Sequence, residues 1–164
     1  MKPKIIIVDE EDNIIGCKER ETAVLEDIYR VSALWVTNSQ GKILLAKRAL
    51  TKSHSPGEWG PAVAGTVEKG EEYLGNIIKE AEEEIGLKDI VPQVGSKERT
   101  RTRYNYFCQW YFLVVDKTLD EFVIDESEVT EVRWFTKDEL QKEIQADPTK
   151  FLKSMQHLVE LFCK

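Results

Sequence analysis

The chain has 164 residues, of which 41% are hydrophobic and 32% are charged, and its formal net charge is −7. This length fits one domain, which buries about 70% of the surface that its unfolded chain exposes. The acidic balance argues against stable binding to nucleic acid and against attraction to acidic membranes.

The first part of the chain consists of short apolar runs separated by polar turns, a pattern typical of β-strands. The EEDN and SQGK turns each separate two such runs, and residues 21–30 are compatible with more than one type of element. Turn-forming residues dominate 51–61, where we expect an exposed loop. The pattern predicts strands at 4–9, 14–16, 31–38, 42–49 and 62–68.

The pattern becomes helical from Glu72 to Ile85. Apolar side chains recur there every three to four residues, which places them on one side of a helix. Gly86 is expected to end this helix in the left-handed conformation that glycine adopts easily. The apolar positions are Leu74, Ile77, Ile78, Ala81 and Ile85.

The remainder of the chain predicts three strands and two helices. The strands are expected at about 90–95, 103–115 and 129–135. A helix over 136–145 has Thr136 as its N-cap and Glu139 three residues later, which is a capping box. A last amphipathic helix begins near residue 147. With no internal repeat or linker, the sequence predicts one α/β domain with a mixed sheet.

The predicted helix over 72–85 carries three glutamates on one face. Glu83 and Glu84 follow Glu80 by three and four residues, so all three carboxylates lie within one turn. Like charges at this spacing destabilise a helix by about 0.2–0.5 kcal/mol per pair. A bound Mg²⁺ or Mn²⁺ ion would relieve this repulsion, because hard cations prefer oxygen ligands. A solvated acidic face is the alternative interpretation.

The wider segment AGTVEKGEEYLGNIIKEAEEEIGL, residues 64–87, resembles the Nudix box. That signature has a glycine, five residues, a glutamate, seven residues and then Arg-Glu-aliphatic-X-Glu-Glu-X-Gly-aliphatic. Lys79 stands at the arginine position, where it keeps the charge but loses the bidentate fork that would hold Glu71. The residues in register are Gly65, Glu71, Glu80, Ala81, Glu83, Glu84, Gly86 and Leu87.

The resemblance implies a metal-dependent pyrophosphohydrolase that cleaves a diphosphate linkage in a nucleoside diphosphate-X substrate. Its implied fold is a Nudix α/β/α sandwich, with an N-terminal hairpin extension over 1–27, a core over 28–146 and a C-terminal helix over 147–164. Glu80, Glu83 and Glu84 are the implied ligands of Mg²⁺ or Mn²⁺. Gly65, Glu71, Lys79 and Gly86 are the implied structural residues of the motif.

Residues 5–71 also resemble the isopentenyl-diphosphate isomerase-like branch of this superfamily, through VDEEDNIIG and LLAKRALTKSHSPGEW. Isomerases of this type use a Cys-X-His segment after the tryptophan and a later Glu-X-Glu pair. Ala64 and Thr66 stand at the first two positions here, and Tyr104 and Tyr106 at the last two. Since alanine cannot exchange a proton, the sequence favours a hydrolase over an isomerase. A non-catalytic nucleotide-binding or sensor protein is a third reading, which the intact box acids disfavour.

Two cations match positions that hold the diphosphate in the isomerase-like branch. These are Arg48 and Lys52, which we expect to bind substrate phosphates. A second basic group, Arg99, Arg101 and Arg103, alternates along an expected strand and either contacts phosphate or forms a solvated stripe. The aromatic residues of the opposite face, such as Tyr104 and Trp110, either stack on a substrate or pack in the core.

The general base is expected to be a box glutamate, Glu83 or Glu80, or a carboxylate from a loop elsewhere. Within the segment DESEVTEVRW, residues 125–134, Glu128 is the preferred loop candidate. Glu126 and Glu98 are the alternatives.

Cysteine usage and the N-terminal segment bear on the compartment. The three scattered cysteines, Cys17, Cys108 and Cys163, indicate neither a disulfide framework nor a zinc site and favour a reducing compartment. The apolar run over 5–8 is too short to span a bilayer or to form the core of a signal peptide. We therefore expect a cytoplasmic protein that acts on a small phosphorylated substrate, a nucleotide derivative, without a membrane partner. Whether it forms a homodimer stays open.

Overall fold

The computed structural model describes residues 2–164 and shows a mixed sheet with helices on both faces. The strands are β1 (Lys4–Val8), β2 (Ile14–Glu19), β3 (Ile28–Thr37), β4 (Ile43–Arg48), β5 (Trp59–Pro61), β6 (Val63–Thr66), β7 (Gln93–Arg101), β8 (Asn105–Val114) and β9 (Val129–Phe135). The helices are α1 (Tyr73–Ile85), α2 (Lys137–Ala146) and α3 (Met155–Phe162), with 3₁₀ turns at Arg20–Thr22, Leu119–Glu121 and Pro148–Lys150. None of the helices in this part of the chain is both long and apolar enough to cross a membrane.

Strand β3 organises the sheet. From Tyr29 to Thr37, one edge of β3 pairs in parallel with β8. The other edge is shared in turn by β1, β6 and β4, all antiparallel to β3. Strand β6 is therefore held in the middle of the sheet, and it delivers the chain directly to the loop that precedes α1.

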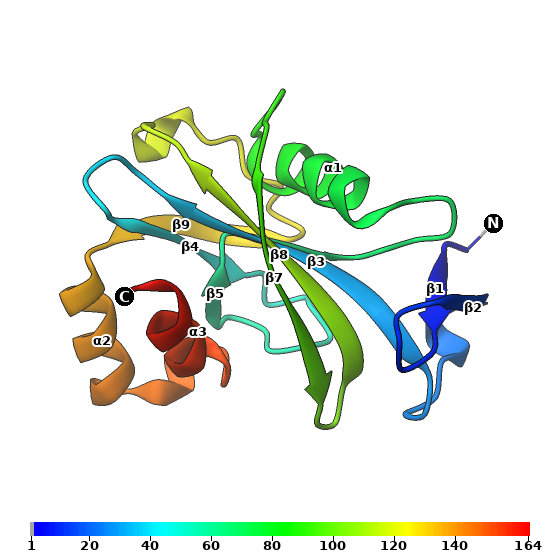
Figure 1. Cartoon of the computed structure of the whole chain (residues 1–164). Coiled ribbons are helices and arrows are strands. Elements are labelled where there is room, and N and C mark those ends of the chain that lie inside the picture. Colours follow the sequence, from blue (N-terminus) through cyan, green and yellow to red (C-terminus); the bar gives the residue numbers. More distant parts are fainter. Residues whose placement is uncertain (1) are drawn as a thin grey trace.

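Alternate residues of β3 serve two separate hydrophobic clusters, as expected from the period of two in a strand. Leu34 and Val36 pack beneath α1, whereas Ala33 and Trp35 pack against α2 and α3. Figure 1 shows α1 on one side of the sheet and the other two helices on the opposite side. The expected α/β/α arrangement is confirmed.

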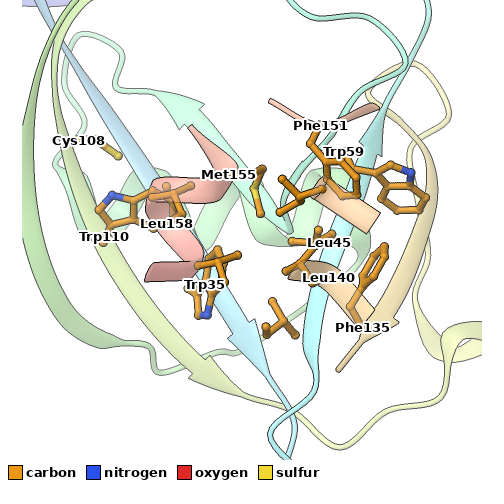
Figure 2. Packing of buried hydrophobic residues seen from close by; sticks show 14 residues of the cluster. Trp35, Leu45, Trp59, Cys108, Trp110, Phe135, Leu140, Phe151, Met155 and Leu158 are labelled. Atoms are coloured by element: carbon orange, nitrogen blue, oxygen red, sulfur yellow. The ribbon is translucent and has the colours of Figure 1, made fainter. Parts of the chain in front are cut away.

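The cluster beneath α2 and α3 is rich in aromatic rings. Figure 2 shows Leu140, Met155 and Leu158 of the two helices packed among rings that include Trp35 and Phe135. Trp59 and Phe135 meet edge to face, with 5.6 Å between ring centroids. This cluster closes the face of the sheet opposite α1.

The N-terminal hairpin is tied to α1 by Asp12, whose backbone has φ +63° in the turn between β1 and β2. Its carboxylate accepts hydrogen bonds from Arg30 Nε at 2.8 Å, from Lys97 Nζ at 2.7 Å and from the Tyr73 hydroxyl at 3.0 Å. Arg30, Tyr73 and Lys97 lie on β3, α1 and β7, so one half-buried carboxylate joins the hairpin to three elements. The expected hairpin is present, and this contact fixes its position.

Several boundaries differ from the sequence-based expectations. The strand expected at 62–68 is shorter and forms β6 over Val63–Thr66, while the end of the segment 51–61, expected to be an exposed loop, forms the short strand β5 with a buried Trp59. Strand β7 begins later than the predicted strand at 90–95 and ends at Arg101. The C-terminal helix expected over 147–164 was too long, because Pro148 starts a 3₁₀ turn and α3 begins only at Met155. The capping box at Thr136 is present.

Candidate active site

One face of α1 forms the wall of a cavity of about 410 Å³. Glu80, Glu83 and Glu84 all line this cavity, because side chains three and four residues apart share one side of a helix. The opposite side of the helix is apolar and packs on the sheet. Burial of that side therefore fixes the direction in which the three carboxylates point.

Two glycines set the position of this helix relative to its surroundings. Gly65 lies on β6 where a Cβ atom would stand only 2.5 Å from Glu80 Cγ, so glycine alone lets the strand and the carboxylate approach this closely. Gly86 ends α1 in the left-handed conformation, with φ +71°, and a Cβ atom there would stand 2.8 Å from Val123 Cβ. Both glycines of the box are thus required by geometry.

Glu71 organises the loop before α1. Its carboxylate accepts hydrogen bonds from the Glu68 backbone N–H at 2.9 Å, from Asn76 Nδ2 at 2.9 Å and from Lys79 Nζ at 2.5 Å. Burial acts to raise the pKa of Glu71, but these hydrogen bonds outweigh it and hold the pKa below its ordinary value. Lys79 also lies 3.7 Å from Glu80 Oε1. The Lys79 ammonium group therefore makes the contact with Glu71 that the box pattern assigns to an arginine.

A buried amide, which the sequence patterns did not reveal, connects this loop to the sheet. The Asn76 side chain is fully buried; it accepts a hydrogen bond from the Ser32 hydroxyl and donates to the Thr66 carbonyl at 3.2 Å. Since a buried amide left unpaired is costly, these partners lock the first turn of α1 onto β3 and β6. The only signal in the sequence was a polar residue among the apolar positions of the helix.

The carboxylates on this face repel one another in the absence of a cation. Burial is the main cause that raises the pKa of Glu84 to about 8, and the charges of Glu80 and Glu128 add to it. Burial also raises the pKa of Glu80, with contributions from Glu83 and Glu71 against the opposing effect of Lys79. Two crowded carboxylates with raised pKa values form a site that a divalent cation would stabilise.

The donor set suits Mg²⁺ or Mn²⁺, because the three side chains that α1 presents to the cavity, Glu80, Glu83 and Glu84, offer carboxylate oxygens. Within residues 2–164, no three acidic, histidine or cysteine side chains are already arranged so that they could hold a metal ion. Mg²⁺ usually keeps several waters and takes oxygens from substrate phosphates, so it needs only one or two protein carboxylates. The residues therefore fit a metal whose coordination is completed by water and substrate.

The end of β4 and the loop after it bring two basic side chains to the same cavity. Arg48 and Lys52 both line it, together with Glu128. Lys52 forms an ion pair with the Glu128 carboxylate, and Arg48 Nε donates to the His54 carbonyl at 2.9 Å. The Ala49 N–H donates to the Glu128 carbonyl at 3.0 Å, which links the two loops that carry these side chains. Arg48 and Lys52 thus share one cavity with the three carboxylates of α1.

The pattern of the NUDIX domain family matches residues 28–155, which is most of the chain. The chain belongs to the Nudix family. It is 29% identical over 137 residues to an uncharacterised Nudix hydrolase of Yersinia pestis, a match that covers 82% of this chain and 73% of the relative. It is also 32% identical over 97 residues to an isopentenyl-diphosphate Δ-isomerase of Serratia proteamaculans, covering 58% and 54%.

The Nudix fold is also found among solved structures. The crystal structure of DR0079 from Deinococcus radiodurans superposes with a TM-score of 0.84 and 23% sequence identity. The match covers 98% of this chain and 99% of that chain, so the arrangement of elements is shared almost from end to end.

Some residues considered from the sequence lie outside the cavity of the Nudix box. Glu126 and Glu98, the alternative general bases, do not line it. Arg99 and Arg101 are both bonded to the Glu10 carboxylate, at 3.2 Å and 2.6 Å, on another part of the surface. Arg99 and Arg101 therefore do not reach this cavity, whereas Glu128 lines it.

The positions that distinguish Nudix hydrolases from isomerases can now be placed. Ala64 and Thr66 line the cavity beside Glu80, so the missing cysteine and histidine would have belonged to this site. Tyr106 is half-buried on β8, where its ring centroid lies 5.4 Å from that of Tyr29. Arg20 and His54 also line the cavity, although no pattern in the sequence pointed to either of them.

Proposed function

We propose that this protein is a divalent-metal-dependent pyrophosphohydrolase that cleaves the diphosphate linkage of a nucleoside diphosphate-X substrate. The observation that carries the proposal is the pairing of Glu80, Glu83 and Glu84 with Arg48 and Lys52 around one cavity. In a chain of net charge −7, cations placed at this point compensate for the repulsion that a polyphosphate would otherwise meet.

Glu80, Glu83 and Glu84 would hold Mg²⁺ or Mn²⁺ through carboxylate oxygens. When bound, such ions neutralise the charge that develops on the phosphates and lower the pKa of a bound water molecule. Gly65 permits the close packing of Glu80 against β6, and the Glu71–Lys79 pair holds the preceding loop. These residues keep the ligands in place before the substrate arrives.

Arg48 and Lys52 would bind the diphosphate oxygens. A phosphate that engages Lys52 competes with Glu128, because the two side chains form an ion pair in its absence. Glu128 is then available to accept a proton from the attacking water, whose oxygen bonds to phosphorus as the bond to the bridging oxygen breaks. The electron pair of the broken bond stays on the departing phosphate.

The experiment is a hydrolysis screen of nucleoside di- and triphosphates, dinucleotides, nucleotide sugars and isoprenoid diphosphates with Mg²⁺ or Mn²⁺. Glu83→Gln is the test variant because it removes one carboxylate of the cavity. Glu82→Gln is the matched control, since Glu82 is on the same helix but is exposed and does not line that cavity. We expect metal-dependent cleavage that falls in Glu83→Gln and persists in Glu82→Gln.

Two other results would overturn this proposal. Double-bond migration in an isoprenoid diphosphate without hydrolysis would make the protein an isomerase. Saturable binding of nucleotides without turnover of any compound would make it a binding or sensor protein.

A further inference from the structure

A second cavity of about 350 Å³ adjoins the one beside α1. Arg20, His54 and Thr66 line both cavities, so they mark the boundary through which the two are continuous. A substrate whose phosphates lie between Glu80 and Lys52 can therefore extend into this second cavity. The volume lies within the range of about 300–1,000 Å³ that is usual for small-molecule sites.

The outer wall of this second cavity is the segment between β2 and β3. Its Val24 and Leu25 side chains are 57% and 59% exposed although both are apolar. The Asp27 carboxylate accepts from the Val24 N–H at 2.8 Å, and Asn105 Nδ2 donates to the Leu25 carbonyl at 2.8 Å. This wall is thus held in place by polar contacts, while its apolar side chains are left without a covering partner.

The inner and far walls are aromatic. Tyr29 of β3 and Tyr104 at the tip of the β7–β8 hairpin both line the cavity. The Tyr104 hydroxyl lies 3.1 Å from His54 Nδ1, and the two rings meet nearly at right angles with centroids 5.2 Å apart. The hairpin tip is therefore joined to the loop after β4, and the cavity is closed on this side.

Two arginines at this cavity lack an acidic partner among residues 2–164. Arg20 and Arg103 line it and enter no ion pair there, whereas Arg99 and Arg101 on the neighbouring strand are both bonded to Glu10. The Arg103 guanidinium lies 5.0 Å from the centroid of the Tyr104 ring. A planar cation beside an aromatic ring offers a surface on which another flat ring stacks.

The polar and aromatic side chains that line this cavity distinguish an alkyl chain from a nucleobase as its ligand. An alkyl chain would strip water from Arg20, Arg103 and the imidazole of His54 without replacing their hydrogen bonds, which is unfavourable. A nucleobase has a flat face for the tyrosine and arginine side chains and an edge of acceptors for their donors. The walls therefore suit a base better than an isoprenoid tail.

We infer that the second cavity binds the base of the nucleoside and that Leu25, Arg103 and Tyr104 determine this preference. The inference rests on the proposed function in one respect, because it takes the phosphates to lie in the first cavity. It goes further by assigning the recognition of the organic group to the segment between β2 and β3 and to the tip of the β7–β8 hairpin.

The test measures equilibrium binding by calorimetry without divalent metal, so that no turnover is required. The ligands are uridine, cytidine, adenosine and guanosine diphosphates, inorganic diphosphate and isopentenyl diphosphate. We expect at least one nucleoside diphosphate to bind wild type about tenfold more tightly than inorganic diphosphate, a ratio that reports the contribution of the base.

Two variants should remove that preference. Leu25→Trp fills the cavity from an exposed position, and Arg103→Gln removes the stacking cation. Their matched controls are Val91→Trp, at a residue that is 90% exposed and does not line the cavity, and Arg101→Gln, which breaks only the pair with Glu10. We expect the two test variants to bring nucleoside and inorganic diphosphates to within about threefold of one another, with both controls unchanged. Thermal unfolding of each variant verifies that it is folded.

Three results would overturn the inference. These are equal binding of nucleoside and inorganic diphosphates by wild type, a preference for isopentenyl diphosphate, and a nucleoside preference that survives in both test variants. The proposed hydrolase activity is tested independently by the hydrolysis screen. If the nucleoside preference is lost in Leu25→Trp but no compound is cleaved with metal, the base cavity is supported and the hydrolase is rejected.

Discussion

Gly65 lies so close to Glu80 that a Cβ atom on the glycine would stand 2.5 Å from Glu80 Cγ and 2.9 Å from its Oε1 atom. The atoms that this Cβ would meet belong to the Glu80 side chain and not to the backbone. Any larger residue would displace the carboxylate rather than unfold the strand. The relationship between this strand and this helix is therefore directly testable.

Gly65→Ala should lower kcat by about 10²-fold, because a displacement of about 1 Å at a catalytic group has this effect. Gly75→Ala is the control, since a Cβ atom there meets no atom within 4 Å. As Gly75 lies inside α1, its replacement should leave turnover intact and stabilise the protein by about 0.5–1 kcal/mol. Steady-state kinetics and thermal unfolding measure the two effects. Full activity in Gly65→Ala would show that the position of Glu80 is not critical.

Lys79→Gln should lower the free energy of unfolding by about 1 kcal/mol and reduce turnover, because Glu71 would lose its cationic partner. The effect is smaller than for a fully buried pair, since the Lys79 side chain is 34% exposed. Lys79→Arg restores the residue of the box pattern and should keep kcat within about threefold of wild type, because the guanidinium retains the contact. Denaturant titration and kinetics of both variants decide the matter. Equal losses in both would mean that shape rather than charge is needed at this position.

Mg²⁺ should raise the melting temperature of the protein without substrate. Burial, together with neighbouring carboxylates, raises the pKa values of Glu80 and Glu84, and a bound cation would compensate this crowded negative charge. At a concentration of about 100 Kd, binding to the folded state alone stabilises it by about 2.7 kcal/mol. Glu83→Gln should weaken this shift and Glu82→Gln should not. The same shift in wild type and in Glu83→Gln would argue against binding of the metal at this face.

The contacts of Asp12 predict a specific dependence of stability on pH. Burial acts to raise the pKa of Asp12, but hydrogen bonds from Lys97, Arg30 and Tyr73 outweigh it and hold the pKa below its ordinary value of 3.8. The folded state therefore binds this proton less tightly than the unfolded chain does. The resulting stability is fully present above the unfolded pKa and is lost as the pH falls through the lower folded value.

Asp12→Asn should accordingly be less stable than wild type at neutral pH, by about 2–3 kcal/mol given the partly buried contacts. The difference should stay constant down to about pH 5 and diminish below about pH 4. Urea titrations of both proteins across this range measure it. A difference that is unchanged at the acid end would show that the charge of Asp12 is not its source.

The parts of the fold that depend on nearby residues could be predicted from the sequence. The spacing of Ile77, Ala81 and Ile85 placed α1, and Gly86 and Thr136 ended one helix and began another through contacts within a few residues. The end of the chain was less predictable, because Phe151 and Leu152 continue the apolar spacing of the last helix toward its start, whereas a 3₁₀ turn forms at Pro148–Lys150 and α3 begins only at Met155.

The same distinction between local and long-range contacts applies to the candidate site. The carboxylates of α1 could be found because helical periodicity and the box fix their spacing. The ion pair of Lys52 with Glu128 joins residues 76 positions apart, and the contact of His54 with Tyr104 joins residues 50 positions apart. Such proximities come from the folding of the whole sheet, and no local pattern in one sequence encodes them. For the same reason, no sequence pattern pointed to Arg20 or to the second cavity.

Strand β3 carries both hydrophobic clusters on its alternate residues and also holds Ser32, the partner of Asn76. Both the position of α1 and the packing of the core therefore depend on β3, whereas Leu25, Arg103 and Tyr104 lie on turns outside this strand. Substitutions in β3 and substitutions in these turns should therefore have different effects. Substitutions in the central strand would reduce stability and catalysis together, while those in the turns could retarget the enzyme to another base and leave its hydrolytic apparatus intact.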